Sequence, residues 1–195
     1  MADEKGIRAF LAIDLPGDVR EKIGDVQAGL KGVLEGIRWT RPEGIHLTLK
    51  FFGDIDKSTI GSISDIIEKK TKGFGPLSLA MGRMGAFPNP GRARVLWIGV
   101  EGETEKLASL QGGMEDDFET LGFARETRSF TPHLTLGRVR SSRRMITGLR
   151  EAMEKIGYEK PDPFQAEGLT LFKSDLLPGG AVYTKLAYFS FGGQE

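Results

Sequence analysis

The sequence predicts an α+β fold with two pseudo-symmetric lobes of mainly antiparallel sheet, outer helices and a central groove. Three observations favour it. The tetrapeptide His-Leu-Thr-Leu occurs twice, at 46–49 and 133–136. A strand–helix–strand order recurs around each copy. No linker-like stretch separates the two halves, so residues 1–195 are expected to form one bilobal domain.

The first half alternates strands and helices. Residues Ile7 to Leu15 are apolar, β-branched or aromatic at strand spacing and end at Pro16-Gly17. Apolar residues then recur at helical spacing over 18–32 and again over 58–70. The remaining expected elements are a short strand at 37–40, the first His-Leu-Thr-Leu strand within 44–53, a strand at 77–84, a loop at 87–91 and a strand at 94–100.

The second half repeats this order less regularly. A helix is predicted over 103–121, where apolar residues recur every three or four positions. The second His-Leu-Thr-Leu strand follows Pro132, and a further helix is expected over 142–156. Two closing strands, at 164–172 and 182–191, flank the turn at 178–180. Outside the tetrapeptides the halves do not visibly align, so the predicted symmetry rests on the repeated motif.

Each tetrapeptide presents an imidazole beside a hydroxyl. Side chains at positions i and i+2 share one face of a strand, so His46 lies beside Thr48 and His133 beside Thr135, while the leucines face the core. These are the only two histidines in the chain. A histidine in a half-buried strand is commonly structural, but two matched copies facing a groove would form an acid–base site.

The paired motifs resemble the HxTx motifs of the two-histidine phosphoesterases, and most closely those of the LigT-like RNA 2′,3′-cyclic phosphodiesterases, once described as 2′-5′ RNA ligases. The similarity runs nearly end to end. Its other segments are Arg8-Ala-Phe-Leu-Ala-Ile13, Arg38-Trp39, Arg94-Val-Leu-Trp97, Phe130-Thr-Pro-His133, Ser174 and Gly179-Gly-Ala-Val-Tyr183.

The resemblance implies hydrolysis of RNA 2′,3′-cyclic phosphate ends, or of cyclic nucleotides, to 2′-phosphates. It implies His46 as proton donor and His133 as proton acceptor, roles that the symmetry of the motifs leaves open. Two imidazoles flanking a phosphate can supply base and acid near neutral pH. The hydroxyls of Thr48 and Thr135 can donate to the non-bridging oxygens. Weak ligation in the reverse direction, through a 2′-5′ bond, is a related expectation.

The fifth position after each histidine is a further candidate substrate contact. The resemblance implies that Arg138 binds phosphate. Strict alternation places this position on the leucine face, so the role requires a bulge or bend near Gly137. A solvated arginine at a strand end is the alternative. Phe51 occupies the matching position after His46, where it would either stack on a base or belong to the core.

Basic residues cluster around the second motif, although the whole chain is neutral, with 27 basic and 27 acidic residues. The cluster would guide an RNA backbone or simply be solvated. In sequence only Glu126 opposes it. The cluster comprises Arg125, Arg128, Arg138, Arg140, Arg143 and Arg144.

Composition limits the cofactors, the location and the kinds of protein that the sequence allows. The chain has no cysteine, and neither tetrapeptide carries a carboxylate, so we expect no metal and no other cofactor. No apolar run is long enough to cross a bilayer and the first residues do not form a signal peptide, so we expect a cytoplasmic monomer that does not contact membranes.

Two non-enzymatic alternatives to the phosphodiesterase remain. One is an RNA-binding module without turnover, and the other is an α+β domain with coincidental motifs.

Overall fold

The computed structural model describes residues 6–140, 146–156, 158, 162–178 and 180–192. In this part of the chain nine strands form one sheet, and all of their pairings are antiparallel. The strands are β1 (Ile7–Ile13), β2 (Ile37–Trp39), β3 (Leu47–Ile55), β4 (Leu77–Phe87), β5 (Val95–Gly102), β6 (His133–Val139), β7 (Phe164–Ala166), β8 (Gly168–Leu177) and β9 (Gly180–Ser190).

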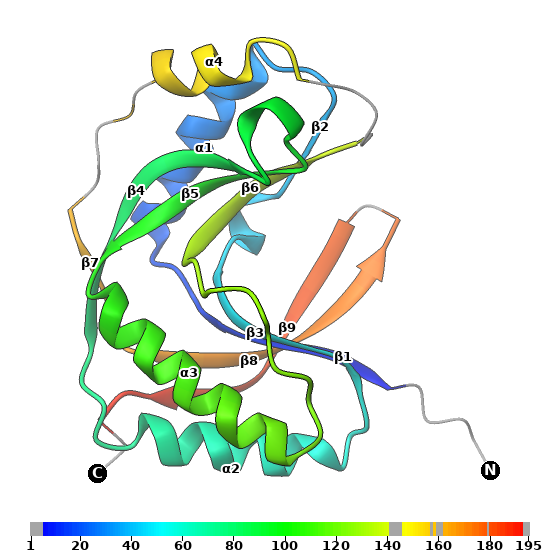
Figure 1. Cartoon of the computed structure of the whole chain (residues 1–195), viewed down its shortest axis with the longest axis vertical. Coiled ribbons are helices and arrows are strands. Elements are labelled where there is room, and N and C mark those ends of the chain that lie inside the picture. Colours follow the sequence, from blue (N-terminus) through cyan, green and yellow to red (C-terminus); the bar gives the residue numbers. More distant parts are fainter. Residues whose placement is uncertain (1–5, 141–145, 157, 159–161, 179, 193–195) are drawn as a thin grey trace.

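The strand order confirms the predicted symmetry. Along the sheet the order is β7-β4-β5-β6-β3-β1-β8-β9, with β2 paired to β6 (Figure 1). Leaving aside the end strands β7 and β9, exchanging β1 with β5, β3 with β6 and β4 with β8 reproduces this order in reverse. The chain visits the two sets in the same sequence, with a helix after each of the first two strands. The topology therefore consists of two matching halves that meet at the two motif strands, β3 and β6.

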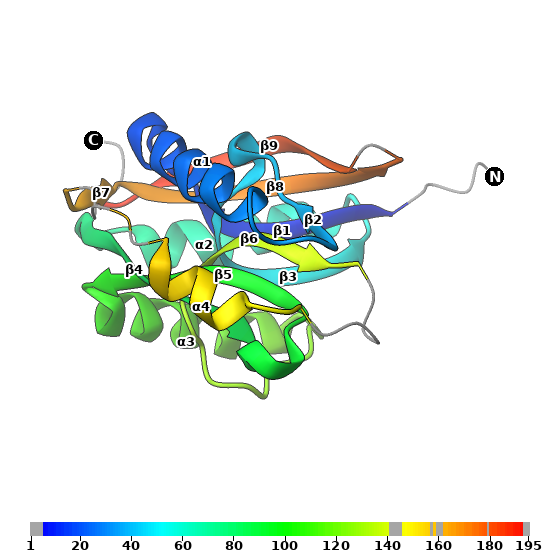
Figure 2. The same cartoon turned by 90° about the horizontal axis from the view of Figure 1, so that it is seen from above.

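Within the described ranges, four helices flank the sheet in two pairs. They are α1 (Gly17–Lys31), α2 (Thr59–Thr71), α3 (Thr104–Thr120) and α4 (Leu149–Lys155). Figures 1 and 2 show α1 beside α4, and α2 beside α3. A Cβ at Gly29 of α1 would lie 3.0 Å from Ile156 just beyond α4, which shows how closely the first pair packs. None of the described helices is long and apolar enough to span a membrane.

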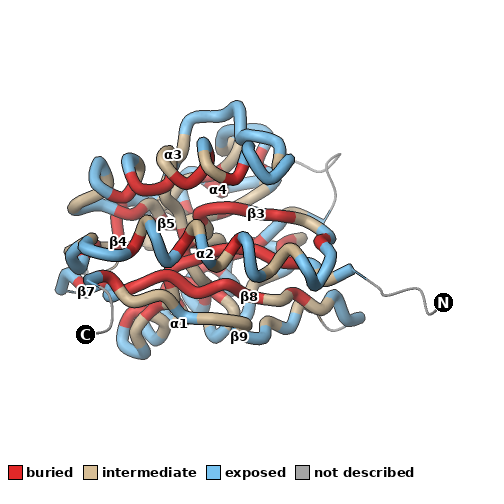
Figure 3. Tube along the Cα trace, turned by 90° about the horizontal axis from the view of Figure 1, so that it is seen from below, coloured by how far each residue is buried: buried red, intermediate tan, exposed pale blue. Residues whose placement is uncertain are grey.

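The core lies between the helices and the sheet. Each helix buries an apolar stripe, such as Val19, Ile23, Val26 and Leu30 of α1, because residues spaced by three or four positions share a helix face. The leucines of both motifs are buried against the same core. Figure 3 shows this burial running along β3 and β8. The motif strands therefore have one core face and one open face.

Two predicted elements are wrong in their extent. The expected helix at 142–156 begins only at Leu149, after Gly148 with a φ of 70°, and residues 141–145 lie outside the described residues. The predicted single strand at 164–172 is two strands that belong to opposite halves. β7 pairs with β4 and β8 pairs with β1, although only Glu167 separates them. The sheet must curl so that its distant parts meet at this residue.

Candidate active site

The two motif strands are direct neighbours at the centre of the sheet. Only Leu47 and Leu134 pair between them, and both are fully buried. Antiparallel register places Thr48 opposite His133 and His46 opposite Thr135, all on the face away from the leucines. The two motifs therefore share one face, as the predicted groove requires, but their strands do not face each other across it. The strands lie side by side and contribute four polar side chains to one face.

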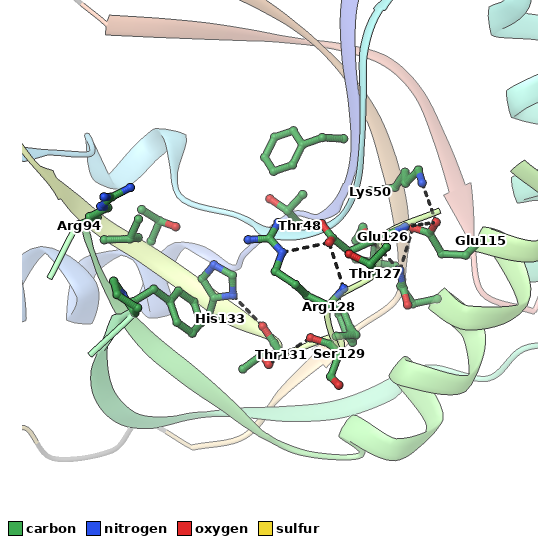
Figure 4. A pocket seen from close by; sticks show the side chains of 18 of the residues that line it. Thr48, Lys50, Arg94, Glu115, Glu126, Thr127, Arg128, Ser129, Thr131 and His133 are labelled. Atoms are coloured by element: carbon green, nitrogen blue, oxygen red, sulfur yellow. Dashed lines mark hydrogen bonds and ion pairs between the residues drawn. The ribbon is translucent and has the colours of Figure 1, made fainter. Parts of the chain in front are cut away.

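A cavity of about 1520 Å³ opens over this face (Figure 4). Five of the six residues predicted for the site line it: Thr48, Phe51, His133, Thr135 and Arg138. The sixth, His46, lies beside the cavity in an aromatic setting. Its ring stacks on Phe10 with centroids 4.5 Å apart and meets Tyr183 edge-on at 5.1 Å. The fold thus gathers both motifs and places one imidazole deeper than the other.

Both imidazoles are held in the same way. Nδ1 of His46 donates to the carbonyl oxygen of Gly44 at 2.9 Å, and Nδ1 of His133 donates to that of Thr131 at 2.7 Å. Because a carbonyl only accepts, each neutral ring carries its proton on Nδ1. The Nε2 atoms are then unprotonated and accept no hydrogen bond from the described residues. Each ring can therefore take up a proton or, once charged, give one up at Nε2.

The surroundings of the two rings differ in charge. Burial lowers the pKa of His46 to about 4, while the hydrogen bond to Gly44 and the Asp14 carboxylate favour the charged ring. Burial also lowers the pKa of His133, and the Arg138 guanidinium disfavours its charged form. Near neutral pH both rings are consequently neutral before substrate binds. The Asp14 carboxylate favours protonation of His46 and the Arg20 guanidinium opposes it. Among the described residues, only a basic group, Arg138, acts on the charge of His133.

A β-bulge in each motif strand changes the face on which the side chain five residues after the histidine lies. In β6 the pairing with β5 passes from Thr135 to Gly137 and skips Leu136. In β3 the pairing with β1 passes from Thr48 to Lys50 and skips Leu49. Both bulges lie three residues after the histidine and reverse the alternation beyond it. Arg138 and Phe51 consequently reach the cavity, and Phe51, 62% exposed, is no core residue.

Two buried glutamines hold these bulges, and sequence reasoning missed both. Nε2 of Gln27 in α1 donates to the carbonyl oxygen of Leu136 at 2.8 Å and to that of Thr40 at 2.7 Å. Nε2 of Gln111 in α3 donates to the carbonyl oxygen of Leu49 at 3.4 Å. Each half therefore supplies the glutamine that supports the bulge of the other half. A polar residue on the buried helix face was the only signal for them in the sequence.

A buried ion pair fixes one wall of the cavity. Nζ of Lys50 donates to Oε2 of Glu115 at 2.6 Å and to the carbonyl oxygen of Ala124 at 2.8 Å. Oε1 of Glu115 accepts from Gln111 at 3.0 Å, and Oε2 accepts from the backbone NH of Glu126 at 3.3 Å. Removing either charge would leave the other buried and unpaired, which is strongly destabilising. The network anchors the segment after α3 to β3.

Some arginines of the predicted basic cluster form ion pairs with acidic side chains. Arg128 pairs with Glu126, the opposing acid that the sequence indicates, through two hydrogen bonds of 2.8 and 3.0 Å. Arg125 pairs with Asp116, which the sequence does not indicate. Arg138 lines the cavity, and Arg140, exposed at the end of β6, does not. Two further members of the cluster, Arg143 and Arg144, lie outside the described residues.

The donor set around the histidines contains hydroxyls and guanidinium groups. Among the described residues no cluster of three or more His, Cys, Asp or Glu side chains is arranged to hold a metal ion. The polar groups that line the cavity near His133 are those that bind phosphate oxygens in proteins: threonine hydroxyls, arginine guanidinium groups and an imidazole.

Two matching half-sheets, each presenting a histidine and a threonine on the same face, define a two-histidine phosphoesterase. Comparison with known families agrees. The model of the family described as LigT like phosphoesterase matches residues 13–97 and again residues 98–183, so each match contains one motif. The chain belongs to the LigT-like phosphoesterase family.

Individual relatives are similar along nearly their whole length. The RNA 2′,3′-cyclic phosphodiesterase of Methanothermobacter thermautotrophicus is 33% identical over 183 residues, covering 94% of this chain and 98% of the relative. The enzyme of the same name from Archaeoglobus fulgidus is also 33% identical, with coverages of 94% and 99%. Among solved structures, TT0787 of Thermus thermophilus has a TM-score of 0.77 at 26% identity, covering 97% of this chain and all of the other.

Another solved structure contains a nucleotide. Escherichia coli LigT complexed with 3′-AMP is 25% identical to this chain, with a TM-score of 0.75, and the match covers 95% of this chain and 98% of that one. The present chain therefore shares its fold with LigT.

Proposed function

We propose that the protein hydrolyses 2′,3′-cyclic phosphates at RNA ends to 2′-phosphates, using His46 as proton donor and His133 as proton acceptor, without a metal ion. The observation that carries this proposal is the matched pair of imidazoles, each bound through Nδ1 to a carbonyl, with Thr48 and Thr135 between them on one face. The names of the two archaeal relatives and the LigT complex with 3′-AMP support the substrate class.

The charges around the rings support the assignment of roles. A base must be neutral, and burial together with Arg138 keeps His133 neutral. A proton donor must be charged, yet burial lowers the pKa of His46 in the free protein. A bound phosphate monoanion raises the pKa of an adjacent imidazole, and the Asp14 carboxylate acts in the same direction, against the smaller effect of the Arg20 guanidinium. In this proposal His46 therefore takes up its proton as substrate binds.

The chemistry is an in-line displacement at phosphorus. His133 removes a proton from the attacking water, and the new P–O bond forms on the side opposite the 3′ oxygen. The bond to the 3′ oxygen breaks, and His46 gives that oxygen its proton. Thr48, Thr135 and Arg138 stabilise the negative charge that builds on the non-bridging oxygens. Phe51, exposed beside the cavity, offers its ring to the base.

Replacing Arg138 by alanine should lower kcat/KM for a cyclic mononucleotide by the equivalent of about 1–3 kcal/mol, the worth of a hydrogen bond to a charged group. Steady-state kinetics with adenosine 2′,3′-cyclic phosphate measure the loss. Arg140→Ala is the matched control, because Arg140 is exposed two residues further along the chain and lies outside the cavity lining. Wild-type kinetics for Arg138→Ala would show that Arg138 does not bind the phosphate.

The reaction should proceed in excess chelator and give only the 2′-phosphate. An oligoribonucleotide with a 2′,3′-cyclic end is incubated with the protein in EDTA, and the phosphate isomers are separated chromatographically. The hydroxyl and guanidinium donors of the site supply the stabilisation that a metal would otherwise provide. Loss of turnover in EDTA that a divalent ion restores would contradict metal independence, and a 3′-phosphate would contradict the direction of opening.

The same experiment decides between an enzyme and a binding module, because a binding module leaves the cyclic phosphate intact. Two titratable rings with free Nε2 atoms favour the enzyme, since binding an anion alone does not require them. Ligation would be the same ring opening with a 5′-hydroxyl as the attacking group in place of water, so that a 2′-5′ phosphodiester forms as the bond to the 3′ oxygen breaks. We expect it to be weak, because water is in large excess.

A further inference from the structure

The cavity is larger than a terminal nucleotide requires. Small-molecule sites typically occupy about 300–1,000 Å³, whereas this cavity has about 1520 Å³. In Figure 4 it extends from the Lys50–Glu115 pair at one end, past Thr48 and His133, to Arg94 at the other end. A nucleotide whose cyclic phosphate lies between the two motifs therefore leaves one end of the cavity for a further group.

The Arg94 end carries cations without an acidic partner. Arg92, Arg94 and Arg138 line this wall with exposed side chains, and none forms an ion pair with any described residue. Two other arginines that line the cavity, Arg125 and Arg128, are each paired with a carboxylate. The net positive charge of the cavity is thus concentrated on one wall, where it attracts phosphate.

The backbone of this wall is held by hydrogen bonds. Oδ1 of Asn89 accepts from the backbone NH of Arg92 at 3.1 Å, and the backbone NH of Arg94 donates to the carbonyl oxygen of Phe87 at 2.7 Å. The carbonyl oxygen of Arg94 accepts from the NH of Val139 at 2.9 Å, which places Arg94 one strand away from Arg138. Neighbouring strands are about 4.8 Å apart. Arginines at this separation can each contact a different phosphate of one backbone.

We propose that Arg92 and Arg94 form a second phosphate subsite, which binds the phosphate on the 5′ side of the terminal nucleotide. The inference rests on the proposed function, since Arg138 and the two motifs hold the cyclic phosphate. The substrate class that this subsite selects is an oligoribonucleotide end, or a cyclic nucleotide with a 5′-phosphate, over a cyclic phosphate on a bare nucleoside.

Three substrates test the subsite: adenosine 2′,3′-cyclic phosphate, its 5′-phosphorylated form, and the dinucleotide ApA with a 2′,3′-cyclic end. Wild-type kcat/KM should be at least about tenfold higher for the last two than for the first, as expected for one charge-assisted hydrogen bond. In Arg94→Ala, and more fully in Arg92→Ala/Arg94→Ala, this ratio should fall to about one. The dependence of log kcat/KM on log salt for ApA should weaken by about 0.7 for each phosphate–arginine interaction that the substitutions remove.

Arg83→Ala is the matched control and should keep the wild-type ratio. Arg83 is also exposed, and it lies on β4 away from this cavity. Three results would each overturn the subsite. The first is a kcat/KM ratio near one between the phosphorylated and unphosphorylated substrates in the wild-type protein, and the second is a double variant that keeps the wild-type ratio. The third is a preference for ApA that the 5′-phosphorylated mononucleotide does not share. Failure of the wild-type protein to hydrolyse all three substrates would instead overturn the proposed function.

Discussion

Replacing either histidine by alanine should lower turnover of a cyclic phosphate by at least about 10²-fold, the lower range for loss of one general acid or base. The rings of His46 and His133 lie on one face of neighbouring strands and would act on a single transition state. The double variant should therefore lose far less than the product of the two single losses. Single-turnover kinetics with saturating substrate measure the chemical step directly.

Asparagine variants separate chemistry from structure. His46→Asn and His133→Asn keep an NH near the position of Nδ1, which can still donate to Gly44 or Thr131, but they lack Nε2. They should retain the wild-type melting temperature and be as inactive as the alanine variants. Substantial turnover by an asparagine variant would mean that the ring acts by position alone. Losses that multiply in the double variant would mean that the two rings do not serve the same step.

A substrate with sulfur in place of the 3′ oxygen should restore most of the activity of His46→Ala and little of that of His133→Ala. A thiolate leaves readily without protonation, because the pKa of a thiol is only about 8.5. The donor therefore becomes dispensable, while the base that activates water does not. The rescue should approach the full loss of about 10²-fold. The measurement is the ratio of rates for the sulfur and oxygen substrates in each variant.

The sulfur substrate also tests which of the two histidines is the proton donor and which is the proton acceptor. Equal rescue of the two alanine variants would remove the distinction between donor and acceptor. Preferential rescue of His133→Ala would exchange the roles and place the 3′ oxygen beside His133. The wild-type protein provides the baseline, since its own ratio of sulfur to oxygen rates corrects for the intrinsic difference between the substrates.

The features that depend on local alternation could be predicted from the sequence. Positions i and i+2 share a strand face, so the pairing of each histidine with its threonine and the burial of the leucines follow directly. The bulge near Gly137 could also be expected, because the phosphate contact that the family resemblance implies for Arg138 conflicts with strict alternation. The matching bulge at Leu49 gives no such conflict, because Phe51 would be acceptable on either face.

The features that depend on distant partners could not be predicted. In the predicted strand at 164–172 the pair Glu167-Gly168 is only a weak break, and the division into two strands appears only once β4 and β1 offer separate edges. Gln27 lies on the buried face of α1, but its acceptor is the carbonyl oxygen of a bulge more than one hundred residues away. Asp116, which neutralises Arg125, belongs to a helix that the sequence does not visibly link to the basic cluster.

The single residue between β7 and β8 has a kinetic consequence. Glu167 joins opposite halves of the sheet, and its carbonyl oxygen accepts from the NH of Phe191 at 2.7 Å, which fixes the junction to the segment after β9. The chain therefore ties the halves together at a point remote from β3 and β6. A hinge motion of one half against the other would break strand pairing at this tie. Catalysis should accordingly proceed without a slow domain-closure step, with product release governed by side chains and loops at the cavity mouth.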